Sequence, residues 1–177
     1  MAGNAAREGK ARGYSLWLMP PGGLRRKLAK TICRLAEECK GPVFEPHVTL
    51  VGGIEKSEKE MVRKTAELAG KIRQFKITLG RTEGTDQYFR CLFARAFETS
   101  ELMVANHKAR ETFGEKGGPG YKPHLSLFYG KLPSGTKKEI ACKYNFSGAK
   151  FEVKRIRLML TKGPPSNWKK VREFYLK

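Results

Sequence analysis

The pattern of apolar and polar positions divides the chain into helical segments and shorter segments that alternate every second residue. Leu24, Leu28, Ile32 and Cys39 recur on one helical face, and Gly41 with the following proline ends that helix. Helices are predicted at 24–39, 57–71, 99–114 and within 134–142, the second and third with hydroxyl N-caps. Strands are predicted at 14–19, 44–50, 75–79, 88–97, 121–127, 150–161 and 168–175, with 80–86 as a turn.

This order of elements is similar in two halves of the chain, 14–79 and 88 onward, because each half has a helix shortly before its central strand. The pattern favours an internal duplication over two independent domains. Strands mixed with helices, without a repeated βαβ unit, indicate an α+β fold. With 177 residues, the chain fits one domain with two lobes at 14–177, preceded by a flexible basic tail at 1–13.

A seven-residue phrase occurs once in each half. Phe44–Leu50 reads FEPHVTL and Tyr121–Leu127 reads YKPHLSL, with the two histidines 124 − 47 = 77 residues apart. The proline forces an extended conformation on the residue before it, and the aliphatic residues that follow favour a strand. Both copies are therefore predicted to be strands.

Side chains alternate between the two faces of a strand, so His47 and Thr49 share one face. His124 and Ser126 share a face in the same way. The aliphatic residues between them can be buried and leave the polar pairs facing a cleft. A single copy would be read as a structural histidine, but two copies with matching flanks predict two imidazoles and two hydroxyls around one phosphate.

The paired motifs resemble the signature of the 2H phosphoesterase superfamily. Further segments resemble its plant and fungal cyclic phosphodiesterase branch: Tyr14–Trp17, Phe89–Phe93, Tyr129 and Trp168–Phe174. The similarity spans the chain from about Tyr14 to Leu176. It implies two antiparallel-sheet lobes with outer helices, related by a pseudo-twofold axis around a central cleft.

The resemblance also implies the reaction, which is hydrolysis of a nucleoside 2′,3′-cyclic phosphate or an ADP-ribose 1″,2″-cyclic phosphate. The product would carry its phosphate on the 2′ or 1″ oxygen. Imidazole, with an unperturbed pKa of about 6.5, suits both proton transfers that this hydrolysis requires. The resemblance favours His124 as the base acting on water and His47 as the acid, with Thr49 and Ser126 binding the other phosphate oxygens.

The resemblance places three aromatic residues in the nucleotide cleft: Trp17, Phe89 and Tyr129. For Trp17 and Phe89 a role in the core is an equally good interpretation. Strict alternation from His124 would put Tyr129 on the wrong face, unless a twist or bulge turns it inward.

Charge and cysteine content narrow the choice of partners. Thirty-six Lys and Arg against 17 Asp and Glu give a net charge of +19, which suits anionic substrates, RNA 3′ ends among them. His107 lacks a partner motif and is expected at the surface.

The four cysteines show no metal-ligand spacing and are expected to be unpaired thiols. We expect no metal, cofactor or membrane segment, and a monomer in the cytoplasm or nucleus.

Two other functions stay open at this stage. One is an RNA-end enzyme of the same superfamily, similar to 2′-5′ RNA ligases or exonucleases, that acts on oligonucleotides. The other is a nucleotide-binding module without catalysis, which would not need two groups suited to proton transfer.

Overall fold

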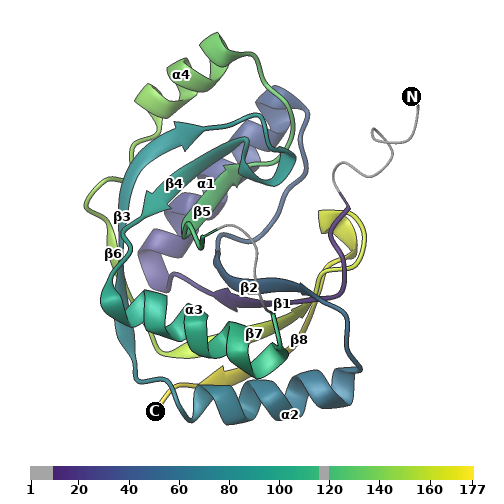
Figure 1. The fold of residues 1–177 in the computed structure, drawn as a ribbon. Helices are drawn as coiled ribbons and strands as arrows, with labels where there is room; N and C mark the ends of the chain where they lie inside the picture. The colour runs from purple at the N-terminus through teal and green to yellow at the C-terminus, as the bar shows by residue number, and fades with distance from the viewer. Residues whose placement is uncertain (1–9, 116–119) are drawn as a thin grey trace.

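The computed structural model describes residues 10–115 and 120–177, and its secondary structure alternates strands with helices (Figure 1). The strands are β1 Tyr14–Leu18, β2 Val48–Ile54, β3 Phe75–Gly84, β4 Leu92–Ala96, β5 His124–Phe128, β6 Lys150–Val153, β7 Arg155–Leu160 and β8 Lys169–Tyr175. The helices are α1 Gly22–Cys39, α2 Glu58–Ala69, α3 Ser100–Phe113 and α4 Ser134–Lys143, with 3₁₀ turns η2 Tyr88–Arg90 and η3 Pro165–Asn167. The predicted α+β class is confirmed.

The strands form one curled antiparallel sheet in the order β6-β3-β4-β5-β2-β1-β7-β8. The order reads as two four-stranded halves that mirror each other about the centre, where β5 meets β2. A single register pair, Val48 with Leu125, joins the halves. The units β1-α1-β2-α2 and β4-α3-β5-α4 therefore occupy equivalent places, as the duplicated phrase predicted.

Each helix that precedes a histidine strand packs against the histidine strand of the other half. Helix α1 lies against β5, and α3 lies against β2. The side-chain amide of Asn106 on α3 donates to the carbonyl of Leu50 at 2.7 Å. The outer helices lie at opposite ends of the molecule, with α4 over β3 and α2 over β7 and β8 (Figure 1). The two His strands are thus held in place by both halves.

The predicted caps are present at two helices. The Ser57 hydroxyl accepts from the Glu60 N–H at 3.3 Å at the start of α2, and the Thr99 hydroxyl accepts from the Leu102 N–H at 3.4 Å at the start of α3. These bonds satisfy backbone donors that the first turn of a helix leaves free.

Several predicted element boundaries were wrong. The two His strands begin later than expected, at Val48 and His124, and the first continues to Ile54. Strand β3 continues through the expected turn at 80–86 as far as Gly84, because its second part pairs with β4 and its first part pairs with β6. Residues 88–90 form the turn η2 in place of strand. The expected strand at 150–161 divides at Lys154, because β6 pairs with β3 in one half and β7 pairs with β1 in the other.

A register shift occurs at the same point of both His strands. Along β5, Ser126 lies opposite Phe93 and Phe128 lies opposite Leu92, so Leu127 is an extra residue. Along β2, Leu50 is the extra residue in the same way. Each bulge reverses the alternation of the residues that follow it. Tyr129 therefore turns toward the same side as His124, which resolves the conflict that strict alternation raised.

The N-terminal segment of the described chain is held by contacts with residues 161 and 163. Residues 1–9 of the expected tail lie outside the described residues, whereas Ala11 forms an isolated bridge with Gly163, and Gly13 accepts from the N–H of Thr161. Within 10–115 and 120–177, no helix is long and apolar enough to cross a bilayer. All four cysteines are free thiols, as expected.

Candidate active site

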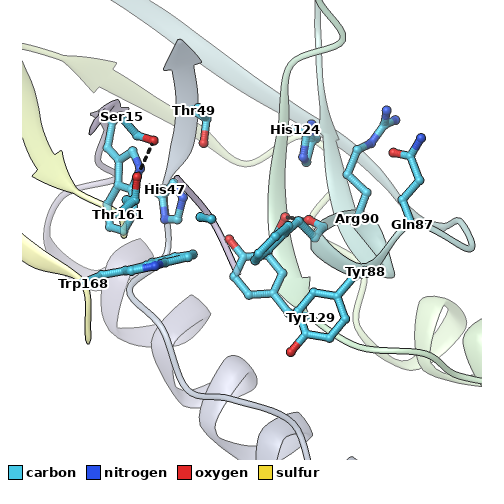
Figure 2. Close-up of a pocket in the computed structure, with 14 residues that line it drawn as sticks. Ser15, His47, Thr49, Gln87, Tyr88, Arg90, His124, Tyr129, Thr161 and Trp168 are labelled. Atoms are coloured by element: carbon cyan, nitrogen blue, oxygen red, sulfur yellow. Dashed lines mark hydrogen bonds between the residues drawn. The ribbon is translucent and has the colours of Figure 1, made fainter. Parts of the chain in front are cut away.

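A cavity of about 460 Å³ lies where the two halves meet. His47 and His124 stand on opposite sides of it, and Thr49 lies between them in the view of Figure 2. The structure brings all seven residues singled out from the sequence to this cavity: Trp17, His47, Thr49, Phe89, His124, Ser126 and Tyr129.

The antiparallel register at the centre of the sheet explains this convergence. Because Val48 pairs with Leu125 in an antiparallel register, the residue before one lies opposite the residue after the other. His47 faces the position of Ser126, and Thr49 faces the position of His124. Each imidazole therefore lies next to the hydroxyl residue of the other motif, while Val48 and Leu125 are fully buried in the core.

Each imidazole is oriented by its own motif. The Nδ1 atom of His47 lies 2.6 Å from the carbonyl oxygen of Glu45, and Nδ1 of His124 lies 2.9 Å from that of Lys122. Because a carbonyl can only accept, Nδ1 carries the proton in both rings. In the neutral rings Nε2 is consequently the basic nitrogen. The residue before the proline thus sets the tautomer in both copies.

His47 is the more enclosed of the two. It is 5% exposed, and its ring stacks on Trp17 with centroids 3.5 Å apart and planes at 5°. The pKa of His47 is lowered to about 3, mainly by burial and also by the charges of His124 and Arg157, while the bond to the Glu45 carbonyl opposes the shift. Free His47 is therefore neutral at physiological pH.

His124 has a more open setting. Its ring meets Phe93 edge-on, with the ring centroids 5.3 Å apart. The guanidinium of Arg90 lies over the same Phe93 ring, 4.7 Å from its centroid. Burial lowers the pKa of His124, as does the charge of Arg90, against the bond to the Lys122 carbonyl. Both imidazoles are thus neutral in the empty cavity, but for partly different reasons.

The two hydroxyl groups also differ. The Ser126 hydroxyl donates to the carbonyl of Phe89 at 2.9 Å, which ties β5 to the turn η2. Within the described residues, the hydroxyl of Thr49 has no protein partner. Thr49 is therefore free to donate to a ligand, while Ser126 must rotate its proton to do so.

An ion-pair network lies behind His47. Glu45 accepts from Arg25 at 2.6 Å and from Arg157 at 2.7 Å, and Arg157 also contacts Glu173 at 2.7 Å. The Arg157 side chain is only 9% exposed, so both carboxylates compensate a charge that water hardly reaches. The network fixes the residue whose carbonyl holds the His47 ring.

Aromatic side chains form one wall of the cavity. Trp168 meets the edge of Trp17 at 5.6 Å, Tyr129 stacks on Phe44 at 3.7 Å, and Phe89 meets Tyr129 edge-on at 5.1 Å. Because His47 covers a face of Trp17, the accessible ring surface comes mainly from the half-buried Phe89 and Trp168. This wall suits the flat surface of a nucleobase.

Comparisons with known proteins identify the family of the chain. A family model described as "Cyclic phosphodiesterase-like protein" matches residues 12–175. The chain belongs to this family. It is a phosphodiesterase of the 2H phosphoesterase type, as the paired motifs predicted.

A relative and several solved structures extend the comparison. The cyclic phosphodiesterase of Arabidopsis thaliana is 27% identical over 153 residues, which cover 84% of each chain. E. coli LigT in apo form matches with a TM-score of 0.63 at 15% identity, over 95% of this chain and 99% of LigT. TT0787 of Thermus thermophilus matches with a TM-score of 0.66 at 19% identity, over 93% and 97%. At these identities the solved structures show the fold alone.

Several residues lining the cavity of this cyclic phosphodiesterase-like protein were not singled out as site residues from the sequence. They are Ala11, Ser15, Gln87, Tyr88, Arg90, Thr161 and Trp168. Ser15 and Thr161 join through their hydroxyls at 2.9 Å, across 146 residues of sequence (Figure 2). Trp168 and Arg90 stood within segments that carried the resemblance, and this was the one available signal for them.

Metal-ligating side chains do not gather at this site. Among the described residues, no group of three or more His, Cys, Asp or Glu could hold a metal ion. His107 is exposed on α3 and lines a separate cavity, as expected for a surface histidine.

Proposed function

We propose that the protein hydrolyses nucleoside 2′,3′-cyclic phosphates by general acid–base catalysis with His47 and His124. The observation that carries this proposal is the shared geometry of the two rings. Both line one cavity, and both commit Nδ1 to a backbone carbonyl, so Nε2 is the nitrogen available to a substrate. Two such nitrogens on opposite sides of a phosphate suit in-line displacement.

The proposed reaction needs two proton transfers. Nε2 of one histidine takes a proton from water as the water oxygen attacks phosphorus. The bond between phosphorus and the 3′ oxygen breaks, and the other histidine gives its Nε2 proton to that oxygen. The products are a 2′-phosphomonoester and a free 3′ hydroxyl. Thr49 and Ser126 donate hydrogen bonds to the non-bridging oxygens, where negative charge grows in the transition state.

The surroundings of the two histidines support different catalytic roles for them. We assign the base to His124 and the acid to His47, as the resemblance implies. Burial makes a charged His47 costly in the empty cavity. A bound phosphate anion next to the ring offsets that cost and favours the protonated form. His47 would thus acquire its catalytic proton together with the substrate.

The comparisons support the substrate class. The Arabidopsis relative is a cyclic phosphodiesterase, and one E. coli LigT structure of the same fold is complexed with 3′-AMP. The aromatic wall beside the histidines offers a surface for a base. ADP-ribose 1″,2″-cyclic phosphate presents the same cyclic ester and is the second substrate we propose, with a 1″-phosphate as product.

The test is hydrolysis of adenosine 2′,3′-cyclic phosphate in EDTA, with the product identified by phosphorus NMR. The expected product is the 2′-phosphate, formed without added metal. His47→Ala and His124→Ala are each expected to lower kcat by at least about 100-fold, the usual worth of general acid–base catalysis.

His107→Ala provides the control, because this exposed histidine lies on α3 in a separate cavity. It is expected to keep full activity. If either motif variant kept most of the wild-type kcat, the two-imidazole mechanism would be wrong. A requirement for metal or a 3′-phosphate product would each reject the corresponding part of the proposal.

A further inference from the structure

The catalytic cavity continues into a second one. A space of about 560 Å³ shares Thr49, Gln87, Arg90 and His124 with the first cavity and extends past His124. Both spaces fall in the range of about 300–1,000 Å³ typical of small-molecule sites. The first cavity has the aromatic wall, whereas the second is lined by three basic side chains, Arg90, Arg110 and Lys122, and by one carboxylate, Glu115. A nucleoside with a single phosphate between the histidines would leave the second cavity empty.

Arg90 stands at the border of these cavities with no acidic partner. Within 10–115 and 120–177, no carboxylate pairs with its guanidinium, and its buried Nε lacks a hydrogen-bond partner. The guanidinium lies over the ring of Phe93, with its carbon 4.7 Å from the ring centroid. Arg157, by contrast, is paired with both Glu45 and Glu173. A buried polar atom without a partner is costly, so an unpaired arginine at a cavity indicates a place for an anion.

The turn that carries Arg90 is braced from several sides. The Thr85 hydroxyl donates to the Arg90 carbonyl at 2.7 Å, and the Arg90 N–H donates to the Gln87 carbonyl at 3.0 Å. Lys137 donates to the Thr85 carbonyl at 3.1 Å and to Asp86 at 2.5 Å. These bonds fix the backbone of the turn that carries Arg90, so the binding of an anion would cost little backbone entropy.

The position of Arg90 separates its ligand from the reacting phosphate. Figure 2 shows His47 and His124 across the cavity from each other, with Arg90 and Gln87 on the far side of His124. A phosphate held between the two imidazoles therefore occupies a different place from an anion held by Arg90. The planar guanidinium offers two parallel donors, which match the oxygens of a phosphate.

We propose that Arg90, with the side chain of Gln87, binds a second phosphate group of the substrate, beyond His124. The proposal rests on the proposed cyclic-phosphate hydrolysis and extends it to substrates with two phosphate positions. Such a phosphate has two sources. One is the phosphodiester that precedes a cyclic-phosphate RNA end, and the other is a phosphate on the 5 position of the same ribose, as in a 5′-phosphorylated nucleotide or in ADP-ribose.

The experiment compares three substrates in wild-type protein and in Arg90→Met. They are adenosine 2′,3′-cyclic phosphate, its 5′-phosphorylated form, and an adenosine dinucleotide ending in a 2′,3′-cyclic phosphate. In wild type, kcat/KM is expected to be at least about 10-fold higher for one of the two-phosphate substrates, as a charge-assisted hydrogen bond allows. The substrate that gains identifies the source of the second phosphate. In Arg90→Met this ratio is expected to fall toward one.

Two further variants make the comparison specific. Arg90→Lys keeps the charge but loses the paired donors, so an intermediate ratio is expected. Arg172→Met removes the same charge from an exposed position on β8 and is expected to keep the wild-type ratio. The proposal is overturned if wild type prefers neither two-phosphate substrate, or if the preference survives in Arg90→Met.

Calorimetric binding separates this outcome from a failure of the proposed function. Wild type is expected to bind adenosine 2′,5′-bisphosphate or a dinucleotide 2′-phosphate more tightly than adenosine 2′-phosphate, and Arg90→Met is expected to lose the difference. If no cyclic phosphate were hydrolysed, the proposed function would fail, while these binding ratios would still support or reject the Arg90 site.

Discussion

The two halves of the molecule share a backbone design but surround their histidines differently. Both His strands have the same bulge, at Leu50 and at Leu127, and both rings bond through Nδ1 to the carbonyl two residues before. His47 is then stacked under Trp17, while the equivalent residue Phe93 meets His124 only with its edge. The shared backbone thus explains the common geometry, and the different neighbours make the two imidazoles chemically unequal.

The charged residues near the two imidazoles differ as well. Arg157 behind His47 is neutralised by two carboxylates, whereas Arg90 near His124 has none among the described residues. The residues after the bulge differ as well: Gly52 occupies the place that Tyr129 takes in the other half. A Cβ at Gly52 would lie 2.8 Å from the Ser15 hydroxyl, so only glycine leaves room for the Ser15–Thr161 pair. One side of the cavity is enclosed, and the other is open and basic.

The largest expected effect of this inequality is on stability in acid. The pKa of His47 is about 3 in the folded protein, against about 6.5 for an unfolded histidine. Between these values the unfolded chain binds a proton that folded His47 does not, so stability falls as pH falls. The loss is at most about 1.4 kcal/mol per pH unit for this one group.

The measurement is the free energy of unfolding in urea between pH 7 and 4, for wild type and for His47→Gln. The variant is expected to remove this slope, while carboxylate contributions common to both proteins cancel in the difference. His124→Gln is expected to remove less of it, because His124 is less enclosed. If the free energy of unfolding fell equally steeply with pH in wild type and in His47→Gln, the burial of His47 would not make it different from His124.

The next effect concerns the residues that hold the rings. Glu45 and Lys122 occupy the same motif position, but only the Glu45 side chain is clamped by arginines. Glu45→Gln leaves Arg157 less well compensated, and a loss of about 1–3 kcal/mol in unfolding free energy is expected. Lys122→Gln, the matched change at an exposed side chain, is expected to stay within about 0.5 kcal/mol of wild type.

Activity and NMR show whether this network positions His47 or only stabilises the fold. Glu45→Gln is expected to lower kcat about 10-fold with little change in KM, because a misdirected ring impairs proton transfer more than binding. The nitrogen chemical shifts of His47 are expected to show a mixture of tautomers, while those of His124 stay unchanged. Unaltered shifts with reduced stability would mean that the network is purely structural.

The sequence was sufficient to predict those parts of the fold that depend on local signals. The caps at Ser57 and Thr99 and the repeated Pro-His phrase each act through neighbouring residues, and the two helices and two strands that they predicted were found. Of the seven predicted site residues that line one cavity, His47, Thr49, His124 and Ser126 meet there because the phrase repeats in two strands that pair at the centre of the sheet. Their chemical roles stay predictions.

Features that depend on distant pairing could not be predicted in this way. Gly80 looked like part of a turn, but strand partners on both sides carry β3 past it. Lys154 has no local signal of a break, which arises because the chain crosses there from one half of the sheet to the other. The Arg157 network joins residues 112 positions apart, and neither periodicity nor spacing reveals such a contact.

The smallest expected difference separates the two hydroxyl groups. Ser126→Ala leaves the Phe89 carbonyl without its donor and loosens the link between β5 and η2. A loss of about 1 kcal/mol in unfolding free energy is therefore expected, as for a typical intramolecular hydrogen bond. Thr49→Ala removes no hydroxyl bond to the described part of the protein and is expected to keep the wild-type unfolding free energy within about 0.5 kcal/mol.

Activity should not follow this order of stability. Both variants are expected to lower kcat, by less than the histidine variants, because each removes a donor to a non-bridging oxygen. Only Ser126→Ala is also expected to raise KM, since Phe89 in the aromatic wall is no longer anchored. If Thr49→Ala destabilised the protein as much as Ser126→Ala, the Thr49 hydroxyl would have a structural bond that this assignment lacks. If either hydroxyl variant were as inactive as a histidine variant, that hydroxyl would do more than bind a non-bridging oxygen.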